Sequence, residues 1–260
     1  MKLKIVDNSL LDEYKKQIPS NLDELISGVS SKQTSVTKDS FDFYISVASV
    51  YSSKIEGEEM ELDSYLKHKY QGIKYLPDYT KRIDDLAEAY KYAMTNPLNR
   101  NNIIIAHTII TKHILITDKR GKLRTAQMFI ADNKGQVNYV AADAGVLHRE
   151  MDKWFDDLAM LTDQVLDNDE ALFYASMLHL TFVNIHPFDD GNGRTGRLLE
   201  KWFLSNYFGK NAWQIESERY YYENLKEYYY SLNRLGNDYE QLDYSQSLPF
   251  TQLLLKSLAL

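Results

Sequence analysis

Twelve consecutive residues hold the side chains of this chain that are best suited to chemistry. From His186 to Arg197 they read His-Pro-Phe-Asp-Asp-Gly-Asn-Gly-Arg-Thr-Gly-Arg. A histidine titrates near neutral pH and can take a proton from a substrate, so His186 is a candidate general base. Asp189 and Asp190 offer the oxygen ligands that Mg²⁺ prefers beside phosphates. The run therefore combines a base with a possible metal ligand.

The second half of this run is suited to binding phosphate. Gly191, Asn192 and Gly193 reach positive φ angles at low cost, so their backbone N–H groups can converge on an anion at the start of the next helix. Arg194 and Arg197 are three positions apart and share a helical face, where each guanidinium can hold phosphate oxygens bidentately. The run is not a P-loop, because no Lys-Ser/Thr pair follows the glycines at the required spacing.

Each residue alone has an ordinary structural explanation, such as a core histidine, a glycine turn or a surface arginine. A structural loop does not need all of them together. The run resembles the signature of the Fic (filamentation induced by cAMP) family, His-Pro-Phe-x-Asp/Glu-Gly-Asn-Gly-Arg-x-x-Arg, at every fixed position. The resemblance implies a mainly α fold, a Fic-type helical bundle with a β-hairpin flap. It also implies the family's usual activity, protein adenylyltransferase, which moves AMP from ATP to a protein hydroxyl.

The resemblance assigns a role to each residue of the run. His186 would be the general base for the target hydroxyl, and Asp190 would hold Mg²⁺, the expected cofactor. The groups expected to hold the phosphates of ATP are the backbone from Gly191 to Gly193, Asn192 at the α-phosphate, and Arg194 and Arg197 at the β- and γ-phosphates. Phe188 would anchor the loop in the core.

A second resemblance lies nearer the N-terminus. The segment Ser52-Ser53-Lys54-Ile55-Glu56-Gly57 is similar to the family's inhibitory-helix pattern, Ser/Thr-x-x-x-Glu-Gly/Asn, with Ser52, Glu56 and Gly57 at its fixed positions. Without that resemblance, it would be read as a helix that ends in a solvated glutamate. The resemblance implies that Glu56 pairs with Arg197 in the place of the γ-phosphate and inhibits the enzyme. The brake would then be intramolecular, with no separate antitoxin.

Residues 123–140 depart from the helical pattern. Apolar residues 128–130 precede the run Asp132-Asn133-Lys134-Gly135, and Val137, Tyr139 and Val140 follow it, which predicts a β-hairpin with an Asn/Gly turn. The resemblance implies a flap that pairs with a target segment in β-fashion, in which Thr125, Gln127 and Met128 help to position the target. The other interpretation is a structural hairpin that caps the core.

Tyrosine is unusually frequent, with 20 in the chain. Tyr221 and Tyr222 resemble a Tyr-Tyr segment that lies near the adenosine in the family, although aromatic residues on a helix more often belong to the core. A second group, Tyr228 to Tyr230, follows closely. We expect some of these tyrosines to line the nucleotide pocket, and exposed ones are candidates for self-modification.

The elements that must position these residues are mainly helices. Only 11 Gly and 5 Pro interrupt the chain, and apolar residues recur at helical spacing. The predicted helices are 41–55, 60–70, 79–95, 100–114, 145–162, 169–185, 194–208, 220–234 and 247–258. We expect residues 1–40 to be a polar, helical appendage of unassigned role. The Fic domain would cover 41–260, with an inhibitory helix at about 41–57, a flap at 123–140 and a catalytic loop at 186–197.

Composition limits the surroundings of the protein. The 260 residues carry 30 Lys+Arg and 37 Asp+Glu, a net charge of −7, which argues against nonspecific binding to nucleic acid. No apolar run approaches the ~18 residues of a membrane span, and the N-terminus lacks a signal peptide. With no cysteine, the chain needs no oxidising compartment, so we expect a cytoplasmic protein. Expected partners are ATP, a target protein and a second copy of the chain.

Three functions fit the sequence. The first is an adenylyltransferase that Glu56 inhibits. The second is the reverse reaction, in which the same residues remove AMP from a modified protein and Glu56 positions water. The third is a regulatory module that binds nucleotide without turnover, against which the intact His186 argues.

Overall fold

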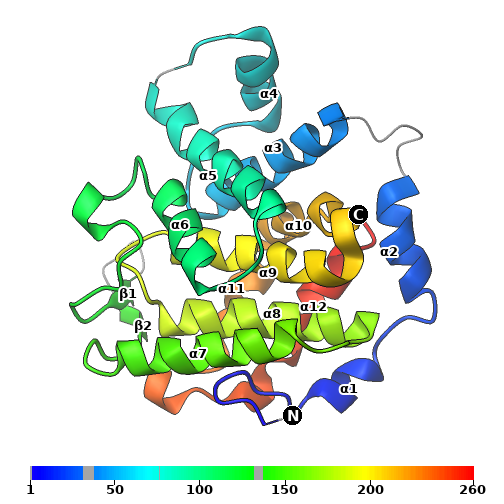
Figure 1. Ribbon diagram of the computed structural model, residues 1–260, viewed down its shortest axis with the longest axis vertical. Helices are drawn as coiled ribbons and strands as arrows, with labels where there is room; N and C mark the ends of the chain where they lie inside the picture. Colours follow the sequence, from blue (N-terminus) through cyan, green and yellow to red (C-terminus); the bar gives the residue numbers. More distant parts are fainter. Residues whose placement is uncertain (1, 32–37, 76, 132–136) are drawn as a thin grey trace.

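The computed structural model describes residues 2–31, 38–75, 77–131 and 137–260. Helices dominate, so the predicted mainly α class is confirmed (Figure 1). The α-helices are α1 Leu11–Lys15, α2 Leu22–Ser31, α3 Lys38–Ile55, α4 Leu62–Gln71, α5 Pro77–Thr95, α6 Arg100–Ile110, α7 Leu147–Thr162, α8 Asn168–Ile185, α9 Asn192–Phe208, α10 Ser217–Glu223, α11 Leu225–Asn233 and α12 Leu248–Ser257. Short 3₁₀ turns lie at Thr117–Lys119, Gly209–Gln214, Tyr239–Gln241 and Tyr244–Gln246. No helix within these ranges is both long and apolar enough to cross a membrane.

Helix α8 is the centre of the molecule. It starts with a capping box in which Asp167 and Glu170 satisfy each other's backbone N–H groups, and almost all of its later residues are buried. Helix α9 packs closely along it, and α7 covers another side (Figure 1). The close approach depends on Gly196 of α9, because an added Cβ would lie 2.7 Å from the His179 ring. The loop from α8 to α9 therefore joins two fixed helices.

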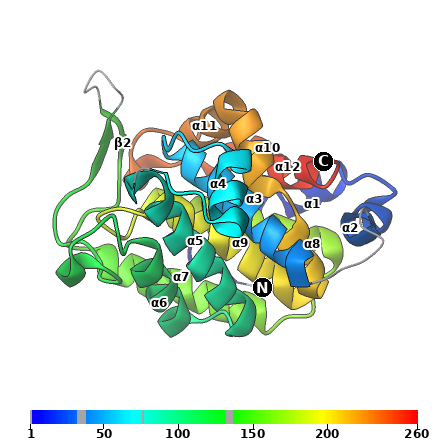
Figure 2. The same ribbon diagram turned by 90° about the horizontal axis from the view of Figure 1, so that it is seen from above.

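The hairpin consists of β1 Phe129–Ala131 and β2 Val137–Val140, which pair antiparallel. Phe129 is opposite Val140, and the register is irregular after Ile130. The strands project from one side of the helical body (Figure 2). The predicted strands are confirmed, whereas the predicted turn, Asp132 to Gly135, lies outside the described residues.

Two helix boundaries differ from the predictions. The predicted helix 220–234 is two helices, because Asn224 takes a non-helical conformation with φ −114° and ψ 38° between α10 and α11. The aromatic residues on both sides hide this break, although Asn disfavours helix interiors. Helix α6 also ends at Ile110 rather than near 114. At α3, by contrast, Gly57 has φ 91° just beyond the helix end, as expected for a helix stop.

The described part of residues 1–40 packs on the common core. Val6, Tyr14 and Leu22 are buried in the same apolar cluster as α8 and α9, and the Tyr14 ring lies 5.3 Å from that of Phe173. The buried Asp157 also accepts backbone N–H groups from residues 4 to 6 at 2.7–2.9 Å. These residues are helical in part, as expected, and the domain boundary at residue 40 stays a prediction.

Candidate functional site

His186 lies where α8 ends. It has φ 53°, and within the described ranges it is the one non-glycine residue with a positive φ. This left-handed conformation is unfavourable for a residue with a Cβ and is common at functional sites. The ring Nδ1 lies 3.1 Å from the carbonyl oxygen of Val183. A carbonyl only accepts, so Nδ1–H donates to it and Nε2 keeps a free lone pair.

The surroundings of His186 favour this neutral form. Burial is the main cause that lowers the pKa of His186 below its usual 6.5, and the charge of Arg124 lowers it further. The hydrogen bond to Val183 and the Glu56 carboxylate act in the opposite direction and are outweighed. The imidazole can therefore accept a proton at neutral pH.

Arg124 connects the flap to this histidine. Its guanidinium is buried and donates to the carbonyl oxygens of His186 at 2.8 Å and Ala126 at 2.9 Å, and also to Ala142. A further bond of 3.3 Å reaches Ile185 in the last turn of α8, where a cation suits the helix dipole. No role was predicted for Arg124, because its acceptors at Ala142 and at Ile185 and His186 are distant in the sequence.

The inner side of the loop rests on His107, which the sequence analysis did not single out. Its ring stacks on Phe188 with centroids 3.6 Å apart. The Gly121 N–H donates to its Nδ1 at 2.9 Å, so its Nε2–H donates to the Asp190 carbonyl, also at 2.9 Å. Burial lowers the pKa of His107 to about 4, which keeps this arrangement neutral. The available signal was a lone histidine within the apolar run Ile103–Ile110.

Asn192 closes the loop on itself. Its side-chain oxygen accepts from the Phe188 N–H at 2.9 Å, and its amide donates to the Phe188 carbonyl at 2.8 Å. These bonds use the side-chain oxygen and one amide N–H of Asn192, and its contact with an α-phosphate stays a prediction. Gly191 is in the left-handed region with φ 81°, and a Cβ there would lie 2.7 Å from Thr111. The loop therefore requires glycine at this position.

The anion site was predicted at the N-terminus of α9. The N–H groups of Asn192, Gly193 and Arg194 lie in its first turn, where no carbonyl of the preceding turn is available to them. The partial positive charge of the helix end adds to these donors. The Glu56 carboxylate lies beside this helix end, because a Cβ on Gly193 would collide with its Oε1.

Glu56 and Ser52 hold Arg197, as the inhibitory-helix resemblance implied. Glu56 Oε1 lies 2.6 Å from Arg197 Nη2. The Ser52 hydroxyl and carbonyl accept from the same guanidinium at 2.8 and 3.0 Å. Arg197 is 1% exposed, whereas 29% of the Glu56 side chain remains accessible. Arg197 is therefore fixed in the core, while Glu56 lies at the open side of the contact.

Charge dominates this contact. Burial would raise the pKa of Glu56, but Arg197 and then Arg194 outweigh it, so the pKa stays below its usual 4.5. Burial would lower the pKa of Arg197, and Glu56 again reverses the direction. Both groups are thus charged near neutral pH.

The guanidinium of Arg194 has longer and fewer polar contacts than that of Arg197. Its Nη1 lies 3.7 Å from Asp190 Oδ1 and its Nη2 lies 3.7 Å from Glu58 Oε1. Its Nε is buried without a hydrogen-bond partner. Such a guanidinium has spare donors for an anionic ligand. Glu58 was missed in the sequence because it lies outside the inhibitory pattern.

Asp190 fits the role of a magnesium ligand beside phosphates. Its side chain is 51% exposed next to the α9 terminus, where it can reach a bound ion. No group of three or more His, Asp or Glu side chains that would form a metal cage occurs in the described ranges. Mg²⁺ usually takes one or two carboxylates, with phosphate oxygens and water completing its shell. The single carboxylate is thus compatible with Mg²⁺ held jointly with a nucleotide.

A cavity of about 600 Å³ opens beside these groups. Its walls include His186, Gly193, Arg197 and Glu56, so it brings together the residues predicted to act as base, anion site and inhibitor. The remaining lining residues come from the hairpin, α8 and α11, namely Ile130, Ala131, Asn138, Tyr139, Val183, Asn184, Tyr228, Tyr229, Leu232 and Asn233. Its size is typical of a small-molecule site.

The predicted tyrosines lie elsewhere. Tyr221 is 1% exposed, and its hydroxyl bonds to the buried carboxylate of Glu200. The Tyr222 ring packs on Tyr51, with centroids 5.6 Å apart, outside the cavity lining. Tyr228 and Tyr229, in the second tyrosine group, line the cavity instead.

The predicted flap residues form the base of the hairpin. Gln127 bonds to the Ala141 carbonyl at 3.1 Å and to the Ala144 N–H at 3.3 Å, which braces the two arms. The Met128 carbonyl accepts from Ala141 N–H at 3.1 Å, and Thr125 is exposed. These three residues are not among those that line the cavity.

Part of this chain is similar in sequence to known proteins. The sequence model of the Fic/DOC family matches residues 97–204. A protein named protein adenylyltransferase Fic from Aedes aegypti is 31% identical over 128 residues, and one from Culex quinquefasciatus is 29% identical over 158. These alignments cover 47% and 57% of this chain but 24% and 30% of the relatives. The chain thus spans less than a third of the length of these two relatives.

Solved structures agree with the fold. A Fic family protein from Desulfovibrio desulfuricans G20 superposes with a TM-score of 0.76 at 19% identity, covering 99% of this chain and 74% of its own. A Fic-domain-containing signaling protein from Bacteroides thetaiotaomicron gives 0.69 at 20% identity, covering 92% and 94%. Residues 97–204 thus match the Fic/DOC family, and the fold of the chain is similar to the folds of these two Fic structures.

Proposed function

We propose that this protein is an adenylyltransferase that moves AMP from ATP to a Ser, Thr or Tyr hydroxyl of a target protein. One observation carries the proposal. A neutral His186 with a free Nε2 opens on the same cavity as an anion site at a helix N-terminus and the buried guanidinium of Arg197. Attack on a nucleotide phosphate needs a base, donors for the phosphate oxygens and positive charge at the leaving group.

The chemistry assigned to each residue follows from its position. His186 Nε2 takes the proton of the target hydroxyl, whose oxygen then bonds to the α-phosphorus. The bond between the α-phosphorus and the bridging oxygen breaks, and pyrophosphate leaves. Arg197, Arg194 and the first-turn N–H groups of α9 hold the phosphates, and Asp190 would hold Mg²⁺, which neutralises phosphate charge when bound.

Glu56 is the proposed brake on this reaction. Its carboxylate uses the Arg197 donor that a terminal phosphate would need and puts negative charge over the Gly193 backbone. ATP must therefore displace Glu56 before its triphosphate can settle. The accessible position of Glu56 makes this displacement possible without moving Arg197. We propose the cytoplasm as the compartment, because a chain without cysteine needs no oxidising surroundings.

The test is nucleotide transfer with and without the brake. Wild type, Glu56→Gly and Glu56→Gly/His186→Ala are incubated with Mg²⁺ and ATP labelled on its α-phosphate, alone and with cell lysate. We expect strong labelling of protein by Glu56→Gly, weak labelling by wild type and none by the double variant, which should still bind ATP. No labelling by Glu56→Gly, although it binds ATP, would reject transferase activity and favour the binding module.

To distinguish transfer of AMP from its removal, wild type and Glu56→Gly are each incubated with protein that already carries AMP. If wild type releases AMP and Glu56→Gly does not, Glu56 positions water and the hydrolase interpretation is correct. If neither releases AMP while Glu56→Gly labels protein, the chain is a transferase with an inhibitory glutamate. Mass spectrometry of the labelled products identifies the acceptor residues, including any tyrosine of this chain.

A further inference from the structure

We infer that His179 and Glu200 are positioning residues, which hold Arg197 through Tyr228 in the orientation needed for the terminal phosphates of ATP. The inference rests on the proposed function and concerns the binding of one of its substrates. Neither His179 nor Glu200 is among the residues that line the cavity, and both lie outside the 186–197 loop. Both lie behind Arg197, on its core side.

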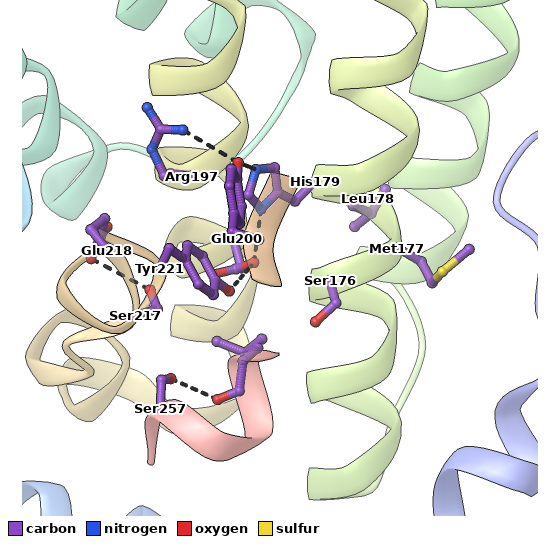
Figure 3. A network of polar contacts seen from close by, with 12 residues as sticks. Ser176, Met177, Leu178, His179, Arg197, Glu200, Ser217, Glu218, Tyr221 and Ser257 are labelled. Carbon is purple, nitrogen blue, oxygen red and sulfur yellow. Dashed lines mark hydrogen bonds and ion pairs between the residues drawn. The ribbon is translucent and has the colours of Figure 1, made fainter. Parts of the chain in front are cut away.

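The four side chains form a continuous line of contacts. Arg197 Nη1 donates to the Tyr228 hydroxyl at 3.3 Å, and that hydroxyl lies 3.3 Å from His179 Nε2. His179 Nδ1 lies 2.9 Å from Glu200 Oε2. Tyr221 also donates to the Glu200 carboxylate, and His179 and Tyr221 converge on it (Figure 3). All of these side chains belong to residues that are at most 2% exposed.

Hydrogen-bond chemistry gives the line a single direction. A carboxylate accepts and does not donate, so His179 donates from Nδ1 to Glu200, and a neutral ring then presents a lone pair at Nε2. The Tyr228 hydroxyl then donates to Nε2, and its oxygen remains free to accept from Arg197. Glu200 thus fixes the tautomer of His179, which fixes the hydroxyl of Tyr228. The Tyr228 hydroxyl oxygen is therefore held as a hydrogen-bond acceptor beside Arg197.

Charge balance supports the same conclusion. A buried guanidinium is costly without a negative partner, and Glu56 is the only carboxylate that an ion pair joins directly to Arg197 within the described residues. If ATP displaces Glu56, the buried Glu200 remains connected to Arg197 through His179 and Tyr228. Arg197 therefore keeps both a core anchor and a remote countercharge when Glu56 leaves. Such a network would make the brake replaceable without disordering the guanidinium it releases.

A purely structural role would leave a different signature. Arg197 is assigned to the β- and γ-phosphates, so a misoriented guanidinium weakens ATP binding while AMP, which lacks those phosphates, binds as before. General loosening of the α8–α9 core would weaken both ligands. The ratio of the two dissociation constants therefore separates positioning from packing.

The experiment measures ATP and AMP binding by calorimetry, with Mg²⁺, in the Glu56→Gly background. Adding Glu200→Gln should weaken ATP binding about 3- to 10-fold, the loss expected for one buried hydrogen bond, with AMP binding unchanged. Glu218→Gln is the matched control. Glu218 is also 0% exposed but pairs with Lys201 at 2.6 Å, away from Tyr228, so its loss should not change the ATP/AMP ratio.

Tyr228→Phe provides the second test, which keeps the inference testable if Glu200→Gln does not fold. It keeps the ring while removing the hydroxyl that joins Arg197 to His179. If the line acts as proposed, Tyr228→Phe shows the same selective loss for ATP, and Glu200→Gln adds nothing to it. Equal losses for ATP and AMP, or additive losses in the double variant, would overturn the inference. Absence of any nucleotide binding by Glu56→Gly itself would instead reject the proposed function.

Discussion

At the scale of single residues, the protonation of His186 decides when the proposed reaction can run. Its Nδ1–H is committed to Val183, so Nε2 can act as a base only while the ring is neutral. Because burial and the charge of Arg124 lower the pKa of His186, the neutral form persists at a lower pH than for an exposed histidine.

This gives a pH prediction for Glu56→Gly. Its transfer rate should rise with pH, reach half of its maximum at a midpoint below 6.5, the usual histidine pKa, and then level off at higher pH. Removing Glu56 takes away a carboxylate that raises the pKa of His186, which moves the midpoint further down. The measurement is kcat/KM between pH 5 and 8.5, with tight ATP binding checked at each pH. A rate that still rises above pH 7.5 would mean that another group limits proton transfer.

Residue types and spacing predicted much of the site, and the reason is local. His186, Gly193 and Arg197 belong to one continuous segment, so their proximity is encoded by that segment alone. The Glu56–Arg197 contact spans 141 positions, and the family resemblance supplied it. His107 could not be found in this way, because its place depends on how α6 packs against the loop. The sequence predicted that some tyrosines line the pocket, but which ones do so depends on how α11 packs.

At the scale of secondary-structure elements, the site depends on how closely α8 and α9 approach. Gly196 lies where the two helices touch, above the side chains of His179 and Val183. The sequence predicted both helices from their apolar residues. It did not predict their separation, because that distance is set by side chains on two elements at once.

We predict that Gly196→Ala destabilises the protein by about 1–3 kcal/mol, the usual cost of overpacking. The new methyl group would lie 2.7 Å from His179 Cδ2 and 2.9 Å from Val183 Cγ1, so the helices must move apart. Gly28→Ala on α2 is the matched control, since nothing lies within 4 Å of its added Cβ, and it should be neutral or slightly stabilising. Urea unfolding of both variants measures the difference. Equal stability of Gly196→Ala and wild type would mean that the α8–α9 contact is loose.

At the scale of the whole molecule, the first 31 residues raise the question of what constitutes the folding unit. Their polar composition suggested an appendage, because most of their side chains are charged or polar. Five apolar side chains are nevertheless buried, Tyr14 at 0% exposed, and six more are partly buried against the core. A largely polar segment can still belong to a core when its apolar residues pack into it. Counting polar residues could not reveal this.

Deletion of residues 1–37 should therefore unfold or strongly destabilise the remainder, rather than release a separate Fic domain. Val6, Tyr14, Leu22, Ile26 and Val29 are each at most 8% exposed. At roughly 1.5–3 kcal/mol for each buried apolar side chain, their loss is comparable with the roughly 5–15 kcal/mol that stabilises a whole domain. The deletion would also uncover the apolar side chains of α8 and α12 that they cover, and it would free Asp157. Circular dichroism melting of the full chain and of a chain that begins at Lys38 makes the comparison, with Asp157→Asn as a milder lesion of the same contact. If the shortened chain melts cooperatively within a few degrees of the full one, residues 1–40 are a separable appendage after all.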